Sequence, residues 1–227
     1  MGAPTMSDHA RRVPRNAALL ITLLSLIVLA PVLSPERSWY IVELLFGLIL
    51  ISGVYSIGPF KYRWAFVLLT VVTLVVRWVE LLSVGSVMDV PAQALTVVWL
   101  GFAIAVIVKH LFQRSDVDID TILGAVVTYL LAAVAFAIVF QIIELLTPGA
   151  FSGIADTAGD HREDLASAMM YYSLVCITTM GYGDVVPVGA LARPLSVLEG
   201  VFGQLYLAVM IARLVGLHIA RESFRDD

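Results

Sequence analysis

The sequence predicts an all-α integral membrane protein with six transmembrane helices and one shorter, re-entrant segment. Of its 227 residues, 60% are hydrophobic and 14% are charged, whereas a soluble domain is about 45–50% apolar and about 25% charged. An α-helix needs about 20 apolar residues to cross about 30 Å of hydrocarbon. Six apolar stretches approach or exceed this length: 17–33, 39–57, 64–85, 92–112, 121–146 and 191–220.

The same composition excludes several other classes of protein. A formal net charge of −4 argues against a broad nucleic-acid-binding face. The single cysteine, Cys176, cannot form an intrachain disulfide, and the four histidines are scattered at positions 9, 110, 161 and 218. The sequence shows neither a metal-binding cluster nor a catalytic set of carboxylates and histidines. We therefore expect no enzyme, no nucleic-acid partner and no cofactor.

The first stretch, 17–33, has a cleaved signal peptide as its alternative interpretation, since Arg11, Arg12 and Arg15 precede it. Its apolar run is longer than the usual run of about 7–15 residues, and no clear Ala-x-Ala cleavage site follows it. We therefore expect this stretch to be retained as a membrane helix.

The distribution of basic residues predicts a multi-pass protein of the cell membrane (plasma or inner membrane) with both termini in the cytoplasm. Cytoplasmic loops carry an excess of Lys and Arg. With an internal N-terminus, the outer side carries only Arg37, Arg162 and Arg193. The inner side then carries Arg11, Arg12, Arg15, Lys61, Arg63, Lys109, Arg114, Arg221 and Arg225.

A polar segment divides the chain into two membrane parts. Residues 113–120 read Gln-Arg-Ser-Asp-Val-Asp-Ile-Asp, which predicts a short cytoplasmic linker. The expected divisions are a cytoplasmic tail (1–16), a four-helix part (17–112), the linker (113–120), a two-helix part (121–222) and a second tail (223–227). We expect membrane lipids around these helices and no soluble ligand-binding domain.

Between the last two spans, the apolar segment 164–178 is too short to cross a bilayer and predicts a re-entrant helix. It runs into Thr178-Thr179-Met180-Gly181-Tyr182-Gly183-Asp184. A cation that sheds its water in a narrow pore needs rings of oxygen ligands, which backbone carbonyls supply when they all point one way. That conformation requires dihedral angles that glycine tolerates and most residues do not. Glycines alternating with larger residues therefore predict an ion-selective loop, reached by the partial negative charge of the helix before it.

This segment resembles the Thr-Val-Gly-Tyr-Gly-Asp signature of tetrameric potassium channels. Residues 119–222 are similar to the two-helix pores of bacterial potassium channels, in the order outer helix, pore helix, filter and inner helix. The resemblance implies a homotetramer, because one chain supplies one filter strand, with potassium as the permeant ion. It implies that Gly183 shapes the outer mouth and that Thr178 lies beneath the filter, near the central cavity. The carbonyls that bind potassium would be those of Thr179, Met180, Gly181 and Tyr182.

The surroundings of the filter depart from the family pattern at several positions. Tyr171 and Tyr172 stand where such channels often carry two tryptophans. They predict either an aromatic cuff, hydrogen-bonded to Asp184 or Tyr182, or plain packing of the rings. Met180 replaces the usual valine. Val175 stands where some relatives have a glutamate that pairs with the filter aspartate, so that this pair cannot form.

Several other residues have more than one interpretation. Gly203 lies about 18 Å along the last span, where similar channels have a gating hinge, and close helix packing is the alternative. A structural bond from Glu144 to the pore-helix or filter backbone is expected, and Glu199 at membrane depth is expected to be functional or paired. The acidic residues of the outer loop either concentrate cations at the mouth or are merely solvated: Asp156, Asp160, Glu163 and Asp164.

The four front helices resemble the layout of voltage-gated channels but lack their charge pattern. Steep voltage sensing needs about 3–4 charges per subunit, and the stretch 92–112 has no basic residue before Lys109. Glu43, Arg77 and Glu80 all fall in the outer half of the membrane. They predict a buried ion-pair cluster or, as the alternative, a small-ligand or lipid site.

Together these features predict a potassium-selective channel that conducts passively and is not gated by a conventional voltage sensor. A non-selective cation channel is the first alternative, should Met180 or the missing glutamate loosen the filter. A membrane transport or signalling subunit is the second alternative.

Overall fold

The computed structural model describes residues 15–29, 35–57, 63–82, 89–113, 118–154 and 162–223. Within these ranges each predicted span, and the re-entrant segment, corresponds to one helix whose ends differ from the prediction by a few residues. The elements are α1 (Arg15–Leu29), α2 (Pro35–Ile57), α3 (Arg63–Leu82), α4 (Asp89–Gln113), α5 (Ile119–Leu146), β1 (Phe151–Ser152), α6 (Arg162–Ile177), β2 (Val186–Pro187) and α7 (Ala192–Ser223). Parts of the predicted tails, the linker residues 114–117, and residues 30–33 and 83–85 of two predicted spans lie outside the described residues.

Three of the described helices are long and apolar enough to cross a membrane, judged by length and composition. They contain the segments Val90–Gln113, Ile119–Leu146 and Ala192–Leu217. The apolar segments of α1, α2, α3 and α6 are shorter: Asn16–Leu29, Glu43–Val54, Trp64–Val79 and Leu165–Ile177. The structure is thus consistent with an all-α membrane protein, while the crossing of six helices stays a prediction.

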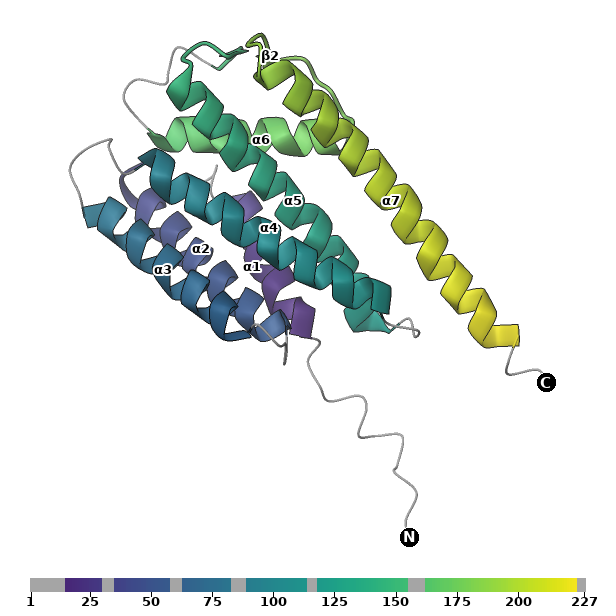
Figure 1. The fold of residues 1–227 in the computed structure, drawn as a ribbon. Helices are drawn as coiled ribbons and strands as arrows, with labels where there is room; N and C mark the ends of the chain where they lie inside the picture. The colour runs from purple at the N-terminus through teal and green to yellow at the C-terminus, as the bar shows by residue number, and fades with distance from the viewer. Residues whose placement is uncertain are drawn as a thin grey trace.

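The helices form two groups, α1 to α4 and α5 to α7, which pack against each other along α5 (Figure 1). Helices α1 to α4 make a bundle that packs alongside α5, and α7 runs on the other side of α5. The short helix α6 lies across the long helices near one end of the molecule, where it contacts both α5 and α7. The start of α5 and the ends of α4 and α7 lie toward the opposite end.

Trp99 on α4 lies in the core of the front bundle, which consists of helices α1 to α4. Its side chain is fully buried, its Nε1 donates to the hydroxyl of Thr70 at 2.8 Å, and its ring stacks on Phe66 with centroids 5.2 Å apart. A Cβ atom on Gly53 would lie 2.6 Å from the Trp99 ring. The glycine therefore admits α2 close to the indole, and the hydrogen bond satisfies the one polar atom of the ring.

Polar contacts join the front bundle to α5 and α7 near the end of α4. The backbone amide of Asn16 donates to Asp120 Oδ1 at 3.0 Å, and the side-chain Nδ2 of Asn16 donates to the backbone carbonyl of Asp120 at 2.9 Å. On α7, the Arg213 guanidinium donates to the Leu111 carbonyl at 2.6 Å and lies 4.8 Å from the centre of the Phe112 ring. A cation at the carbonyl end of a helix is favourable, so Arg213 links α7 to α4.

Candidate functional site

The loop after α6 begins with four successive amides that point back at the helix. The amides of residues 178–181 all donate to carbonyls in the last turn of α6, at 2.9 to 3.4 Å. Carbonyl ends of helices lack internal partners, so the loop supplies donors where α6 needs them. The donor–acceptor pairs are Thr178 with Leu174, Thr179 with Cys176, Met180 with Val175, and Gly181 with Val175.

This arrangement determines where the loop's carbonyls point. In a planar trans peptide the carbonyl of one residue points opposite to the amide of the next, and the described chain has no cis peptide bond. Because the amides of residues 179–181 face α6, the carbonyls of Thr178, Thr179 and Met180 face away from it. Three successive carbonyl oxygens therefore lie on the side of the loop that faces away from α6.

The φ angles of residues 179–183 alternate in sign along the loop. Thr179, Gly181 and Gly183 have positive φ angles of 59°, 56° and 78°, and Thr179 is the only described non-glycine residue with a positive φ. Met180 and Tyr182 therefore have negative φ. Alternation of this kind gathers successive amides on one side of the chain. A β-branched residue at positive φ is strained, and such strain clusters at functional sites.

Tyr171 supports the outer end of the loop. Its hydroxyl donates to Asp184 Oδ2 at 2.6 Å, and its ring stacks on Tyr182 with centroids 6.5 Å apart and planes 11° from parallel. Of the two acceptors that the sequence allowed, Asp184 therefore receives the hydrogen bond. Donation from Tyr171 is the main reason that the pKa of the Asp184 carboxyl lies below its ordinary value. This carboxyl carries its negative charge beside the end of the loop.

Tyr172 does not join Tyr171 at the loop. It is buried, its hydroxyl donates to Ser196 Oγ on α7 at 2.6 Å, and its ring meets the edges of Phe140 and Phe151. The packing alternative therefore holds for Tyr172, whose direct contacts are with α5, α7 and β1. Consecutive residues on a helix point in different directions, which is why only one of the two tyrosines reaches the filter segment.

The expected bond from Glu144 to the pore helix or filter is wrong. Its carboxylate instead accepts from the amides of Gly149 at 2.6 Å and Phe151 at 3.0 Å, in the loop that follows α5. The reason is local, because a side chain at the last turn of a helix lies within reach of the amides of the turn that ends it. Glu144 thus orders the start of the loop that follows α5.

A two-stranded sheet connects this outer loop to the segment after the filter. Strands β1 and β2 pair antiparallel, with Phe151 opposite Pro187. Gly153 has a φ of +85°, and a Cβ atom there would lie 1.8 Å from the carbonyl oxygen of Asp184. Only glycine fits this approach. The outer loop therefore packs directly on the backbone at the end of the filter segment.

Gly203 lies at a tight helix contact. A Cβ atom at this position would be 2.4 Å from the carbonyl oxygen of Ile177, the last residue of α6. Helix α7 runs without interruption from Ala192 to Ser223. The structure therefore favours the packing interpretation of Gly203, and the hinge stays a prediction.

Several polar residues around the end of α6 have partners that could not be predicted from the sequence. The Tyr129 hydroxyl on α5 donates to the Ile177 carbonyl at 2.8 Å, and Gln204 Nε2 on α7 lies 3.4 Å from Thr179 Oγ1. Ser173 contacts Glu199, which the sequence singled out only as a carboxylate at membrane depth. A polar residue within an apolar span was the available signal, but sequence spacing does not identify its partner.

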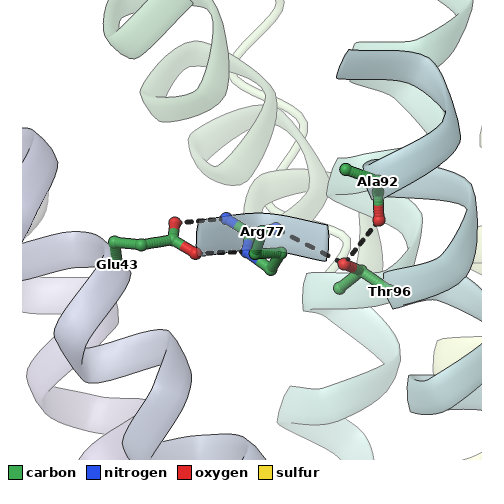
Figure 2. A network of polar contacts seen from close by, with 4 residues as sticks. All are labelled: Glu43, Arg77, Ala92 and Thr96. Carbon is green, nitrogen blue, oxygen red and sulfur yellow. Dashed lines mark hydrogen bonds and ion pairs between the residues drawn. The ribbon is translucent and has the colours of Figure 1, made fainter. Parts of the chain in front are cut away.

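A second polar cluster lies in the front bundle (Figure 2). Arg77 Nε and Nη2 donate to the two carboxylate oxygens of Glu43, each at 2.6 Å, and its Nη1 donates to Thr96 Oγ1 at 3.4 Å. The guanidinium also lies 4.4 Å from the centre of the Phe46 ring. The predicted ion pair is confirmed for these two residues. The side chain of Glu80 lies outside the described residues, as do Asp156, Asp160 and the side chains of Glu163 and Asp164.

Comparison with known proteins adds independent information on the second half of the chain. Residues 124–218 match the model of a protein family described as ion channel. Protein LctB of Bacillus caldotenax is 28% identical over 98 residues, which cover 43% of this chain and 72% of that protein. Protein LctB of Geobacillus stearothermophilus is 25% identical over 120 residues, which cover 53% of this chain and 89% of that protein. No solved structure was found to match. The family match therefore supports an ion-channel domain built from α5, α6, the loop and α7.

Proposed function

We propose that this chain is the subunit of a potassium-selective channel, in which four copies surround one pore and potassium moves passively down its electrochemical gradient. The observation that carries the proposal is the backbone of residues 178–183. The amides of residues 178–181 bind the end of α6, the carbonyls of residues 178–180 point away from α6, and the φ angles of residues 179–183 alternate in sign. Rings of such carbonyls replace the water shell of a dehydrated cation.

In this proposal potassium is held by the carbonyls of Thr179, Met180, Gly181 and Tyr182. Thr178 lies below them and Gly183 shapes the outer mouth. A single chain supplies one quarter of each ring, which is why the proposal requires a homotetramer. The negative charge of Asp184, repeated around the mouth, raises the local concentration of cations.

The front bundle supports gating by something other than a conventional voltage sensor. Arg77 donates hydrogen bonds to Glu43 in α2 and to Thr96 in α4, and the ring of Phe46 in α2 covers one face of its guanidinium. Steep voltage sensing needs about 3–4 charges per subunit that move through the membrane field, and the stretch 92–112 has no basic residue before Lys109. We propose that the bundle lies in the cell membrane with both chain termini in the cytoplasm. Large exposed apolar side chains on α2, α3 and α7 suit contact with lipid or with neighbouring subunits.

The test is the reversal potential of the purified protein in planar bilayers under a potassium/sodium gradient. Current that reverses near the potassium equilibrium potential and is blocked by barium supports the proposal. Gly181→Ala should abolish potassium preference, because alanine rarely adopts the positive φ of 56°. Gly101→Ala is the matched control, since nothing lies within 4 Å of its Cβ position and Gly101 is exposed on α4. Unchanged selectivity in a folded Gly181→Ala protein contradicts the proposal.

A non-selective cation channel is the second candidate, favoured by the position of Met180. Met180 is 62% exposed in the single chain, and its side chain is longer than that of the valine usual at this position. The ratio of potassium to sodium permeability separates the two functions. A ratio near one in the wild type that rises in Met180→Val would establish the non-selective channel and explain it.

A further inference from the structure

One face of α7 makes three successive contacts with the second half of α6. The three α7 residues are separated by three and four positions, the spacing that places side chains on one helix face. Their partners are likewise grouped at the second half of α6, just before the loop. The pairs are Ser196 with Tyr172, Glu199 with Ser173, and Gly203 with Ile177.

Glu199 is the unusual member of this row. Its side chain is fully buried in a helix that is apolar enough to span a membrane. Among the described residues no basic side chain forms a salt bridge with it. A carboxylate without a cationic partner is costly in such a place, whereas a neutral, hydrogen-bonded carboxyl group is tolerated.

The hydrogen bonds of Ser173 indicate which form is present. Its hydroxyl contacts Glu199 Oε1 on α7 and also donates to the Ala133 carbonyl on α5 at 2.7 Å. A hydroxyl has only one proton to donate, and the Ala133 carbonyl has none. Both contacts are hydrogen bonds only when Glu199 carries a proton and donates it to Ser173. A protonated Glu199 therefore completes a chain of two hydrogen bonds across α7, α6 and α5.

This chain joins α6 directly before the turn that holds the loop. Ser173 is followed by the three residues whose carbonyls accept the loop amides, Leu174, Val175 and Cys176. A change in the position of this turn is transmitted to the loop, because four amides are bonded to it. We infer that Glu199, as a neutral acid, is a positioning residue for the filter and acts through Ser173. The inference rests on the proposed potassium-binding function of the loop.

The experiment measures how potassium stabilises the purified protein. The melting temperature is recorded as potassium replaces sodium at constant ionic strength, which reports filter occupancy without requiring an open gate. Glu199→Ala and Ser173→Ala should each raise the potassium concentration for half-maximal stabilisation about tenfold, which corresponds to about 1.4 kcal/mol. The double variant should be no worse than the poorer single variant, because both remove one shared contact.

Two further variants separate positioning from ordinary packing. Glu199→Gln should retain the wild-type potassium dependence, because its amide has the same shape and donates to Ser173 without a charge. Ser196→Ala is the matched control from the same helix face, since it also removes one buried hydrogen bond between α6 and α7. It should lower the melting temperature equally in sodium and in potassium.

The outcomes distinguish this inference from the proposed function. If the wild type melts identically in potassium and sodium, the potassium-binding loop itself is refuted, and the inference with it. If the wild type responds to potassium and folded Glu199→Ala or Ser173→Ala responds equally, only the positioning role is overturned. If Glu199→Gln and Glu199→Ala raise the potassium concentration for half-maximal stabilisation equally, Glu199 does not act as a neutral hydrogen-bond donor to Ser173. If Ser196→Ala raises the potassium concentration for half-maximal stabilisation as much as Glu199→Ala does, the effect comes from general packing between α6 and α7 and not from Glu199. Ser173→Ala, the smaller change, provides the answer if Glu199→Ala does not fold.

Discussion

Replacement of Gly203 by alanine tests the contact between α7 and the end of α6. The added Cβ would lie 2.4 Å from the carbonyl oxygen and 2.8 Å from Cγ1 of Ile177. The carbonyl belongs to the backbone and also accepts from Tyr129 at 2.8 Å, so it has little freedom to yield. Restoring ordinary contact requires α7 to retreat by about 1 Å.

The expected cost follows from two opposing effects. Overpacking of this kind destabilises a protein by about 1–3 kcal/mol. Alanine improves helix propensity over glycine by about 0.5–1 kcal/mol. The difference between these two effects is about 0–2.5 kcal/mol. Because the clash is with a backbone carbonyl that has little freedom to yield, we expect the upper part of this range, about 1–2 kcal/mol, or a melting temperature lower by about 2–8 °C for a chain of this size.

Thermal unfolding of purified protein in detergent measures the effect, with Gly216→Ala as the matched control. Gly216 lies on the same helix, is exposed, and has nothing within 4 Å of its Cβ position. Only the gain in helix propensity applies there, so its melting temperature should rise by about 1–4 °C. A Gly203→Ala protein that melts at or above the wild-type temperature would refute the tight contact with Ile177. The interpretation of Gly203 as a gating hinge would then be favoured over close packing.

Two further predictions concern the charged contacts. Glu43→Gln should destabilise the protein by about 3 kcal/mol, because it leaves Arg77, whose side chain is only 14% exposed, without its counter-charge. Denaturant unfolding of this variant should show the loss, and a cost under about 0.5 kcal/mol would contradict an ion pair shielded from solvent. Because the folded pKa of Asp184 is depressed, its bond with Tyr171 contributes fully above the ordinary pKa of 3.8 and is lost as pH falls through the lower folded value. Potassium affinity should therefore be constant from about pH 7 to pH 5 and fall below about pH 4 in the wild type. In Tyr171→Phe the fall should begin at a higher pH, because Asp184 no longer has the hydrogen bond that lowers its pKa; a wild-type fall centred near pH 6 would point to another group.

The helices could be predicted closely because their signal is local. A long apolar run has one stable solution in a bilayer, since every backbone amide must be satisfied within the segment. The predicted stretches therefore correspond to α1 to α5 and α7, and the short stretch before the glycines corresponds to α6. The small sheet of β1 and β2 was not predicted, because two-residue strands have no readable period and form only where the outer loop meets the segment after the filter.

The candidate site was predictable in its location and less so in its contacts. The alternation of Gly181 and Gly183 with larger residues indicated an unusual backbone, and both glycines do adopt positive φ. The partners of Glu144 and Tyr172 were misjudged or left open. Both residues lie in helices, and the direction of a side chain around its helix selects a partner that the sequence does not name.

The sequence by itself determined the membrane character, the order of the helices and the position of the filter-like loop, because hydrophobicity and glycine spacing act over short distances along the chain. The tertiary structure decided which polar groups meet. Ser173, Glu199 and Ala133 come from three helices separated by 26 and 40 positions, and only packing brings them together. The same holds for Gly203, whose role depends on how closely α7 approaches Ile177. Contacts between distant segments depend on helix rotation and separation, which a local pattern does not encode.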